Sequence, residues 1–489
     1  MQRHQIFVLI ICGLYLNSLW AFSDVRLPAK DKFFFGISNA PSQVEDDLSD
    51  IWMDFARAGH IPAFDNYPHA EDRIRFWTEP EKEIALAKEL GVQVFRLGVD
   101  WQRIVPREGY IDWKALEHYK YILKLIKKND MKVMLTLFHH TEPGWTFKQG
   151  SWRNKKMVEY FRPFWTVVLD QLGPSIDYLC TFNEAQVYVL MTQVAGLWPH
   201  LKKPNALGIF NIGPFKGRFE RSLRHMAQAH KEIYAYAKGN RFNFPIGIAH
   251  NVGYYYGKKG FAKLSAKVSW SKFNYKFPDL MANSLDYLGI NYYGIEVVKG
   301  LGVQFDKDYE YSDSGRGIFP DGLYLVLKKF HSRYNIKKKH RSRHAGEIPF
   351  IITENGIADG NDWFRSLYIA EHLAAVSKAM SEGVQVQGYI HWTLTDNFEW
   401  GDGYCPKFGL SGIDRNSPDF KRLPRESFYF YKKVIDTGFV SAEQRAELKY
   451  KFQSKIGLPR PMCRLEDGVT PLKEPRFVPV RNVDWTFHY

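Results

Sequence analysis

Eight short apolar runs, distributed from residue 33 to residue 394, restrict most strongly what this chain can fold into. Several of them, such as the run that ends in Thr353-Glu354-Asn355, have no polar face, and a run of this kind suits a strand that is buried on both sides, as in a parallel sheet. We therefore predict eight strands, at Phe33–Ser38, Val92–Val99, Lys132–His139, Asp177–Asn183, Phe244–Val252, Leu285–Tyr293, Phe350–Asn355 and Val386–Leu394.

Helical stretches separate the predicted strands. Asp112 precedes one of them in the N-cap position, and Gly91 and Gly383 follow the ends of two others. Eight strand-then-helix units over about 400 residues predict an α/β fold, a (β/α)8 TIM barrel with loop insertions. The helical stretches are Glu79–Leu90, Trp113–Asn129, Lys155–Leu172, Glu220–Lys238, Gly322–Tyr334 and Arg365–Glu382.

The two ends of the chain lie outside this alternation. Residues 1–22 form a short N-terminal hydrophobic segment, which fits a signal peptide or a membrane anchor. Bulky Trp20 and Phe22 near the possible cleavage point favour an uncleaved anchor. We expect residues 30–440 to form the barrel and residues 441–489 to be a C-terminal extension that packs on it.

Positive charge is in excess, and it is unevenly distributed. The formal net charge is +14, and basic residues are densest at 258–276, which holds six lysines, and at 337–344. Each region could be a solvated loop or a surface attracted to an anionic membrane, where a basic residue near the lipid contributes about 1 kcal/mol. No nucleic-acid-binding motif accompanies the charge, so we predict no nucleic-acid partner.

The four cysteines are scattered and include no C-x-x-C pair. This spacing predicts neither a disulfide framework nor a zinc site. Cys180 lies inside a predicted strand and is expected to be a buried thiol. We expect no metal ion and no other cofactor.

Two of the predicted strands end in a glutamate beside an asparagine. Glu184 follows Asn183 at the end of the fourth strand, and Glu354 precedes Asn355 at the end of the seventh. A lone glutamate there could simply be solvated, but burying a carboxylate is costly unless something pairs with it or uses it. In a barrel both would face the mouth, and glycoside chemistry requires two such carboxylates, one protonated and one ionised.

Further polar and aromatic side chains are predicted at the same strand ends, and together they supply the carboxylates, amides and flat rings that a hydroxyl-rich sugar needs. Arg96 could keep Glu354 ionised because a nearby cation lowers a carboxylate pKa, whereas Glu184 needs a raised pKa to act as an acid. The histidines could instead be core residues and the tryptophans packing aromatics. The set is Gln43, Arg96, His139, His140, Asn183, Tyr293, Trp392, Phe398, Glu399 and Trp400.

From about Phe33 to Ile435 the chain resembles glycoside hydrolase family 1, the β-glucosidase family. The resemblance implies that Glu184 is the acid/base and Glu354 the nucleophile, and that Tyr293 and Arg96 support the nucleophile. It also implies a substrate-binding set of Gln43, His139, Asn183, Tyr293, Trp392, Glu399 and Trp400. The segments that carry it are GISNAPSQVE at 36–45, TLFH at 136–139, TFNE at 181–184, GINYY at 289–293, ITENG at 352–356 and WTLTDNFEW at 392–400.

A divergent plant branch of that family, called sensitive-to-freezing, resembles the chain more closely. The chain has His140 where the family usually has tryptophan, Ala185 where it usually has proline, and Lys407 where it usually has arginine. Members of the branch are galactolipid galactosyltransferases of the outer chloroplast envelope. The shared segments are NYPHAEDR at 66–73, MKVMLTLFHH at 131–140, SGRG at 314–317, PDGLY at 320–324 and DWTFHY at 484–489.

This narrower resemblance implies a retaining galactosyltransferase that acts on galactolipids. It would transfer a β-galactosyl group from monogalactosyldiacylglycerol to another galactolipid, releasing diacylglycerol, through a covalent glycosyl-glutamate intermediate. It implies a membrane surface as partner and a membrane-associated location at the chloroplast outer envelope. One alternative is a retaining β-glycosidase, soluble or secreted, that hydrolyses soluble β-glucosides or β-galactosides. The other is a non-catalytic sugar- or lipid-binding relative, which typically lacks one of the two glutamates.

Overall fold

The computed structural model describes residues 22–200, 217–300, 302–343 and 345–489. The predicted N-terminal hydrophobic segment therefore lies, except for Phe22, outside the described residues. In the part of the chain that is described, no helix is long and apolar enough to span a membrane. The first described strand, β1 (Val25–Arg26), pairs antiparallel with β13 (Phe439–Val440).

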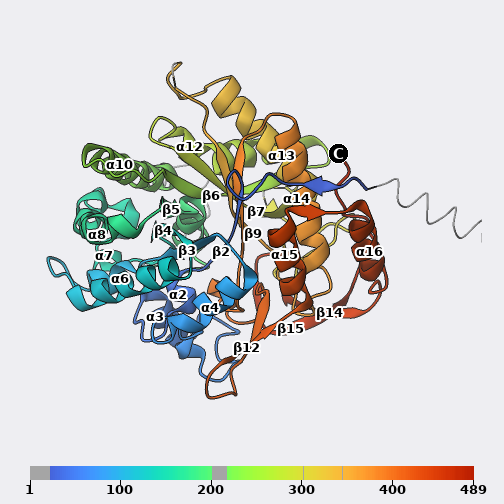
Figure 1. Ribbon diagram of the computed structural model, residues 1–489, viewed down its shortest axis with the longest axis horizontal. Helices are drawn as coiled ribbons and strands as arrows, with labels where there is room; N and C mark the ends of the chain where they lie inside the picture. Colours follow the sequence, from blue (N-terminus) through green and yellow to red (C-terminus); the bar gives the residue numbers. More distant parts are fainter. Residues whose placement is uncertain (1–21, 201–216, 301, 344) are drawn as a thin grey trace, which may run out of the picture.

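Eight parallel strands form a closed barrel at the centre of the molecule (Figure 1). Each pairs with the next along the chain, and the last pairs with the first, so no strand edge is left open. The predicted eight-stranded α/β barrel is confirmed. The strands are β2 (Phe34–Ser38), β3 (Val94–Gly98), β4 (Lys132–Phe138), β5 (Tyr178–Asn183), β6 (Ile246–Tyr256), β7 (Tyr287–Lys299), β9 (Phe350–Asn355) and β10 (Val386–His391).

Helices surround the barrel and cover its outer face (Figure 1). The apolar face of each helix packs on the strands because those strands are buried on both sides. Six of these helices were predicted from the sequence to within a few residues at each end. The barrel helices are α4 (Pro80–Leu90), α6 (Trp113–Lys128), α8 (Met157–Leu172), α10 (Arg218–Gly239), α11 (Gly260–Ser269) with α12 (Lys276–Asp279), α13 (Pro320–His331), α14 (Arg365–Ser381) and α15 (Glu426–Thr437).

Short insertions follow the carboxyl ends of the strands. They build the rim of the barrel mouth, where a (β/α)8 fold forms its active site. They include α2 (Pro41–Val44), α3 (Ile51–Arg57), α5 (Trp101–Ile104), α7 (Gly144–Lys148), α9 (Ala185–Val189), the π-helix η4 (Leu190–Ala195), β8 (Gly302–Val303), the 3₁₀ turn η9 (Trp400–Asp402) and the hairpin β11 (Ser411–Asp414) to β12 (Lys421–Pro424).

Side chains fill the barrel interior below the mouth. A compact apolar cluster there takes one residue from most of the strands, so the barrel is a packed core and not a pore. Its buried members are Phe34, Val94, Met134, Tyr287, Ile351 and Ile390, with Tyr178 packed against them.

Strands β6 and β7 extend farther than the sequence indicated. They were predicted to end at Val252 and Tyr293, but β6 reaches Tyr256 and β7 reaches Lys299, and Tyr256 pairs with Val297. The two strands therefore project together beyond the mouth. Helix α11 follows this projection, so the basic region 258–276 is largely helical rather than a loop.

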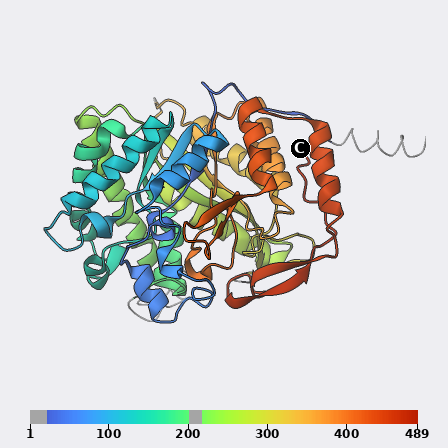
Figure 2. The same cartoon turned by 60° about the horizontal axis from the view of Figure 1, so that its bottom comes forward.

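The chain beyond residue 440 packs on the barrel helices. Helix α16 (Ala442–Gln453) lies against α14, where buried Arg445 donates two hydrogen bonds to the Glu371 carboxylate, at 2.8 and 2.7 Å. An antiparallel hairpin, β14 (Pro459–Arg464) and β15 (Pro471–Pro479), follows at the rim (Figure 2).

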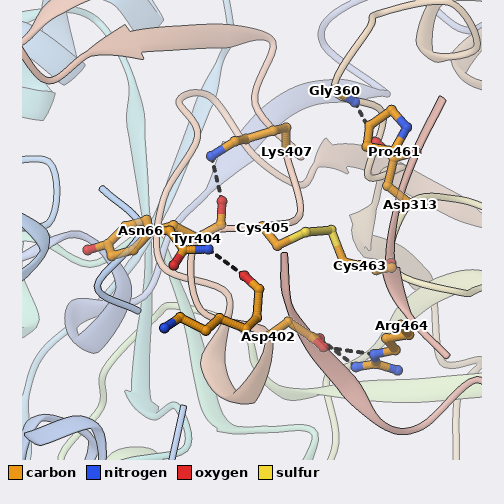
Figure 3. Close-up of a disulfide and its surroundings, with 12 residues drawn as sticks. Asn66, Asp313, Gly360, Asp402, Tyr404, Cys405, Lys407, Pro461, Cys463 and Arg464 are labelled. Carbon is orange, nitrogen blue, oxygen red and sulfur yellow. Dashed lines mark hydrogen bonds and ion pairs between the residues drawn. A yellow bond between two sulfur atoms is a disulfide. The ribbon is translucent and has the colours of Figure 1, made fainter. Parts of the chain in front are cut away.

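A disulfide ties this hairpin to the barrel, and the prediction that the cysteines form no disulfide is wrong. Cys405 and Cys463 are joined by an S–S bond of 2.10 Å across 58 residues (Figure 3). Sequence spacing could not reveal the pair, because only the fold brings the loop after η9 beside β14. Cys180 is a buried free thiol, as predicted.

Candidate active site

A pocket opens at the carboxyl ends of the barrel strands and encloses about 120 Å³. Glu184 and Glu354, from the ends of β5 and β9, both line it, and β6 and β7 lie between these two strands. The other lining residues are His139, His140, Asn183, Val187, Met191, Trp198, Asn251, Tyr293, Ser314, Arg316, Trp392, Glu399, Trp400, Asp402, Phe408 and Arg464.

Glu354 is held at the end of β9 by two donors. Arg96 Nη1 lies 2.5 Å from its Oε1, and the hydroxyl of Tyr293 donates to its Oε2 at 2.7 Å. Gly356, two residues later, has no room for a side chain, because a Cβ there would lie 1.9 Å from the carbonyl oxygen of Trp392. The Glu-Asn-Gly sequence thus lets the chain turn tightly beside Trp392 while both carboxylate oxygens of Glu354 stay fixed.

Glu184 occupies the junction between β5 and α9, where its backbone is left-handed, with φ 44° and ψ 45°. This conformation is costly for a residue with a Cβ, and such residues cluster at functional sites. The amides of Asn291 and Asn251 donate to Glu184 Oε1 at 2.9 and 3.0 Å. His140 Nε2 lies 3.9 Å from Glu184 Oε2.

A hydrogen-bond network connects the surroundings of the two carboxylates. Arg96 Nη2 donates to Asn183 Oδ1 at 2.7 Å, while its Nη1 bonds Glu354. Asn291 Nδ2 donates both to Asn183 Oδ1, at 3.1 Å, and to Glu184. Because Arg96 and Asn291 meet on the same amide oxygen, the positions of the two glutamates depend on one another.

Aromatic rings and a third carboxylate form the rest of the wall. Trp392 Nε1 donates to Glu399 Oε1 at 3.3 Å, and His139 lies between Trp392 and Trp400, with ring centroids 5.9 and 5.8 Å away. His139 Nε2 also contacts the side-chain amide of Asn183 at 2.9 Å. The pocket therefore combines flat rings with hydrogen-bonding groups.

Gln43 and Arg96 stand behind this wall. Gln43 is fully buried and its amide donates to the carbonyl of Phe398 at 2.7 Å, but it is not among the residues that line the pocket. Arg96 reaches the site through Glu354 and Asn183. Phe398 does not line the pocket either, whereas the other predicted site residues all reach its surface.

Comparison with known proteins identifies the family of this barrel. The model of Glycosyl hydrolase family 1 matches residues 27–259 and 256–439, which together make up most of the chain. The chain belongs to glycosyl hydrolase family 1. It is therefore an enzyme of the glycoside hydrolase type, as the sequence motifs indicated.

Two plant proteins are similar to this chain over most of their length. Galactolipid galactosyltransferase SFR2, chloroplastic, of Arabidopsis thaliana is 38% identical, with 94% of this chain and 82% of that protein covered. Beta-glucosidase-like SFR2, chloroplastic, of Oryza sativa subsp. japonica is 36% identical, with coverage of 86% and 77%. Among solved structures, the β-glycosidase of Pyrococcus horikoshii is 25% identical, covers 88% of this chain and 98% of that one, and has a TM-score of 0.72.

Burial dominates the electrostatics of Glu354 in this family 1 site. It raises the pKa of Glu354 to about 7; Arg96 lowers that pKa, the Glu184 charge raises it, and the Tyr293 hydrogen bond lowers it. Burial also raises the pKa of the Tyr293 hydroxyl well above its ordinary value, so Tyr293 remains a donor at neutral pH. The predicted role of Arg96 in favouring the ionised form is thus present, but burial opposes it.

The pKa of Glu184 shifts in the opposite direction, below its ordinary value. Burial favours a higher pKa, but His140 and the amides of Asn291 and Asn251 bring the pKa below its ordinary value. Burial also lowers the pKa of His140, so its ring is mainly neutral at neutral pH and attracts the carboxylate less strongly than an imidazolium would. Because the two glutamates repel each other, we expect the pair to retain one proton near neutral pH. In the free protein this proton lies mainly on Glu354, and the catalytic form, with the proton on Glu184, is the minor form of the same singly protonated pair.

Several lining residues were missed in the sequence. Asn251 comes from β6 and lies one residue before the predicted end of that strand at Val252, so the position of polar residues at strand ends could have revealed it. Ser314 and Arg316 come from the long β7–α13 connection, and Arg464 comes from the C-terminal hairpin, outside the family match. Arg464 donates two hydrogen bonds to Asp402, at 2.9 and 2.6 Å (Figure 3). Within the described residues, no cluster of His, Cys, Asp and Glu side chains could hold a metal ion.

Proposed function

We propose that this enzyme is a retaining galactosyltransferase that moves a β-galactosyl group from monogalactosyldiacylglycerol to another galactolipid. The observation that carries the proposal is the presence of Glu184 and Glu354 in one pocket, with Glu354 held by Arg96 and Tyr293. The Arabidopsis relative is named a galactolipid galactosyltransferase, which supports a galactolipid substrate.

In the first step Glu354 is the nucleophile. One of its carboxylate oxygens attacks C1 of the donor galactose, and the bond from C1 to the glycerol oxygen breaks. Glu184 gives its proton to that oxygen, so diacylglycerol leaves as a neutral alcohol. Arg96 and Tyr293 hold the attacking carboxylate in place, and Arg96 offsets its negative charge before attack.

In the second step Glu184 is the general base. It removes the proton from a sugar hydroxyl of the acceptor galactolipid, whose oxygen attacks C1 from the face that the glycerol left. The bond between C1 and Glu354 breaks, so both carboxylates return to their initial states. Two displacements at C1 give overall retention, and the product is an oligogalactosyl lipid.

The remaining pocket residues recognise the hydroxyl groups of the sugar. We assign sugar contacts to His139, Asn183, Glu399 and Trp400, and stacking on the sugar face to Trp392. Gln43 lies behind the wall, and its buried Oε1, which has no hydrogen-bond partner among the described residues, is the atom to which we assign a further sugar contact.

We also propose that the enzyme works at a membrane surface, at the outer envelope of the chloroplast. Both plant relatives carry the word chloroplastic in their names. In this proposal residues 1–22 remain attached as an anchor, residues 30–440 form the catalytic barrel, and residues 441–489 are the extension that completes the pocket rim through Arg464.

Product analysis tests the function. The protein is incubated with vesicles that contain monogalactosyldiacylglycerol, and the lipids are separated by thin-layer chromatography. We expect oligogalactosyl lipids together with an equivalent amount of diacylglycerol. Glu354→Gln and Glu184→Gln should abolish both products, and their absence with the wild-type protein would refute the transferase.

A retaining β-glycosidase is the second candidate. The ring and carboxylate set around Trp392 and Glu399 fits a sugar whatever its aglycone, and the rice relative is named beta-glucosidase-like. This candidate predicts rapid hydrolysis of nitrophenyl β-glucoside or β-galactoside in water without lipid. Free galactose in place of oligogalactosyl lipid in the vesicle assay would favour it.

A further inference from the structure

Helix α11 presents an apolar stripe to solvent. The side chains of Phe261, Leu264 and Val268 are 59%, 57% and 55% exposed. At about 100° per residue they fall within about 60° of the helix circumference, so they form one continuous ridge. Apolar residues exposed singly are ordinary on a protein surface, but three in line on one helix indicate a contact that the isolated chain does not make.

The opposite side of α11 packs on the barrel through small side chains. Ala266 is buried, and Ala262, Ser265 and Ser269 are half-buried. The helix contacts β6, β7 and the π-helix η7 (Trp270–Tyr275). A helix that served only to cover the barrel would turn its large apolar residues inward, whereas α11 turns them outward.

Lysines flank the ridge on one side. Lys263 and Lys267 are exposed, and they lie about 60–140° around the helix from Leu264 and Val268. Lys259 immediately precedes the helix. In the part of the chain that the structure describes, these three lysines have no carboxylate partner, whereas Lys258 pairs with Asp308 at 2.7 Å.

Helix α11 also lies on the side toward which the pocket opens. It follows β6, whose Asn251 donates to Glu184 and which continues five residues farther, about 17 Å at about 3.3 Å per residue. Lys258, just before the helix, is joined to the loop that carries Asp308. The start of the ridge therefore stands at the barrel rim, near the entrance to the pocket.

The other basic region does not share this position. Residues 337–343 connect α13 to β9, and a connection that leads into a strand lies at the amino end of the barrel, away from the mouth. Its exposed neighbour Ile336 stands alone and is not part of a helical stripe. Of the two basic regions, only the one at α11 has an apolar ridge and lysines without a carboxylate partner, and lies near the entrance to the pocket.

We propose that α11 is the helix through which the enzyme docks on an anionic lipid bilayer. Phe261, Leu264 and Val268 enter the boundary between headgroups and acyl chains, and Lys259, Lys263 and Lys267 contact lipid phosphates. Helices with one apolar ridge beside lysines bind membrane interfaces in this way. The net charge of +14 favours the same partner. The inference rests on the proposed function only in taking the surface to be lipid.

Hydrogen exchange on the full-length protein locates the contact. The protein is exchanged alone, with vesicles of phosphatidylcholine, and with vesicles that also contain anionic phosphatidylglycerol. We expect anionic vesicles to slow exchange in peptides that cover residues 260–269 and to leave residues 337–343 unchanged. If residues 260–269 exchange equally fast with and without anionic vesicles, the docking proposal is overturned, even if the protein binds vesicles through residues 1–22.

Substitutions measure separately how much the apolar ridge and the lysines contribute to vesicle binding. Phe261→Ser, Leu264→Ser and Val268→Ser together should weaken co-sedimentation with anionic vesicles by at least about tenfold. Lys263→Glu with Lys267→Glu should weaken it by about tenfold or more, and most strongly at low salt. The matched control is Ile336→Ser with Tyr450→Ser, two side chains that are each 67% exposed elsewhere. Binding by the triple variant within twofold of wild type, or equal loss in the control, would refute the proposal.

Two further measurements distinguish a variant that does not fold from a failure of the docking proposal or of the proposed function. Unchanged thermal unfolding shows that the variants fold. The binding vesicles contain no galactolipid, so α11-dependent binding without galactosyl transfer would refute the proposed function alone. Transfer on galactolipid vesicles that is unaffected by the triple substitution would refute the docking role while leaving the transferase intact.

Discussion

The hydroxyl of Tyr293 donates a hydrogen bond of 2.7 Å to the Oε2 of Glu354, on the side of the carboxylate away from Arg96. Glu354 is buried and Tyr293 is half-buried, so this bond stabilises the ionised carboxylate in a place where burial disfavours it. The attack on C1 requires that ionised form. The contact therefore predicts how activity depends on pH.

Replacing Tyr293 by phenylalanine should lower kcat and move the pH profile. Losing the hydrogen bond raises the pKa of Glu354 beyond about 7. Since the pKa of Glu184 is lower, the last proton of the pair leaves near the pKa of Glu354, so the alkaline limb of the kcat/KM profile should move to higher pH. A hydrogen bond to a charged group contributes about 1.5–3 kcal/mol, and kcat should fall about 10–100-fold. The measurement is the rate on a soluble nitrophenyl galactoside from pH 5 to 9. An alkaline limb that stays in place would show that Tyr293 does not support the ionised nucleophile.

His140 should set the opposite limb of that profile. Burial raises the pKa of Glu184, and His140 is the main group that lowers it. In His140→Phe the pKa of Glu184 rises, and because Glu184 has the lower pKa of the pair, the acidic limb of kcat/KM should move to higher pH. Phenylalanine retains the ring contacts that His140 makes with Trp198 and Trp400. The alkaline limb is the internal control, and movement of that limb alone would contradict this assignment.

The Cys405–Cys463 disulfide should stabilise the C-terminal hairpin and, through it, the pocket. Cys463 precedes Arg464, which lines the pocket and bonds Asp402 (Figure 3). Cys463→Ser should lower the free energy of unfolding by roughly 2–4 kcal/mol, because the unfolded chain loses a 58-residue loop constraint. The loss is measured by thermal unfolding, and KM for the galactolipid should rise.

Two controls accompany the disulfide prediction. Cys405→Ser should have the same effect, and the double variant should be no worse than either single variant. Reduction of the wild-type protein should reproduce the loss. If reduction leaves the unfolding temperature unchanged, the bond does not stabilise the folded chain.

The barrel was predictable because its strands are buried on both sides and its helices on one, which leaves strong patterns in the sequence. The same patterns did not predict the parts of the chain that project beyond the barrel. β6 and β7 continue past Val252 and Tyr293 because they pair with each other above the mouth. Helix α11 was missed because its large apolar residues face solvent, so it has no core-facing stripe.

The catalytic pair was predictable, whereas much of the pocket rim was not. Glu184 and Glu354 end strands, and the fold brings all strand ends together. Arg464 and Asp402 are 62 residues apart and meet only because β14 returns to the rim. Gln43 shows the converse, since it follows a strand closely but turns to the carbonyl of Phe398 beneath the pocket wall.

Buried Asp100 makes stability depend on pH. Its Oδ1 accepts a hydrogen bond of 2.8 Å from the backbone of Arg103 and caps α5, but its Oδ2 has no partner among the described residues. Burial, with the nearby charges of Asp50 and Glu45, raises its pKa to about 7. The pKa in the unfolded chain is about 3.9. The contribution of Asp100 is therefore fully favourable only below the unfolded pKa and is lost as pH rises through about 7.

Replacing Asp100 by asparagine removes this dependence, because asparagine keeps the capping oxygen and cannot ionise. We expect Asp100→Asn to be more stable than wild type, by a margin that grows by roughly 3 kcal/mol between pH 5 and pH 8. Unfolding by denaturant at the two pH values measures the margin. Asp112→Asn is the matched control, because Asp112 caps α6 in the same way through a 3.0 Å bond from Ala115, at a more exposed site. A margin that is equal at both pH values would show that Asp100 is not protonated in the folded enzyme at pH 5.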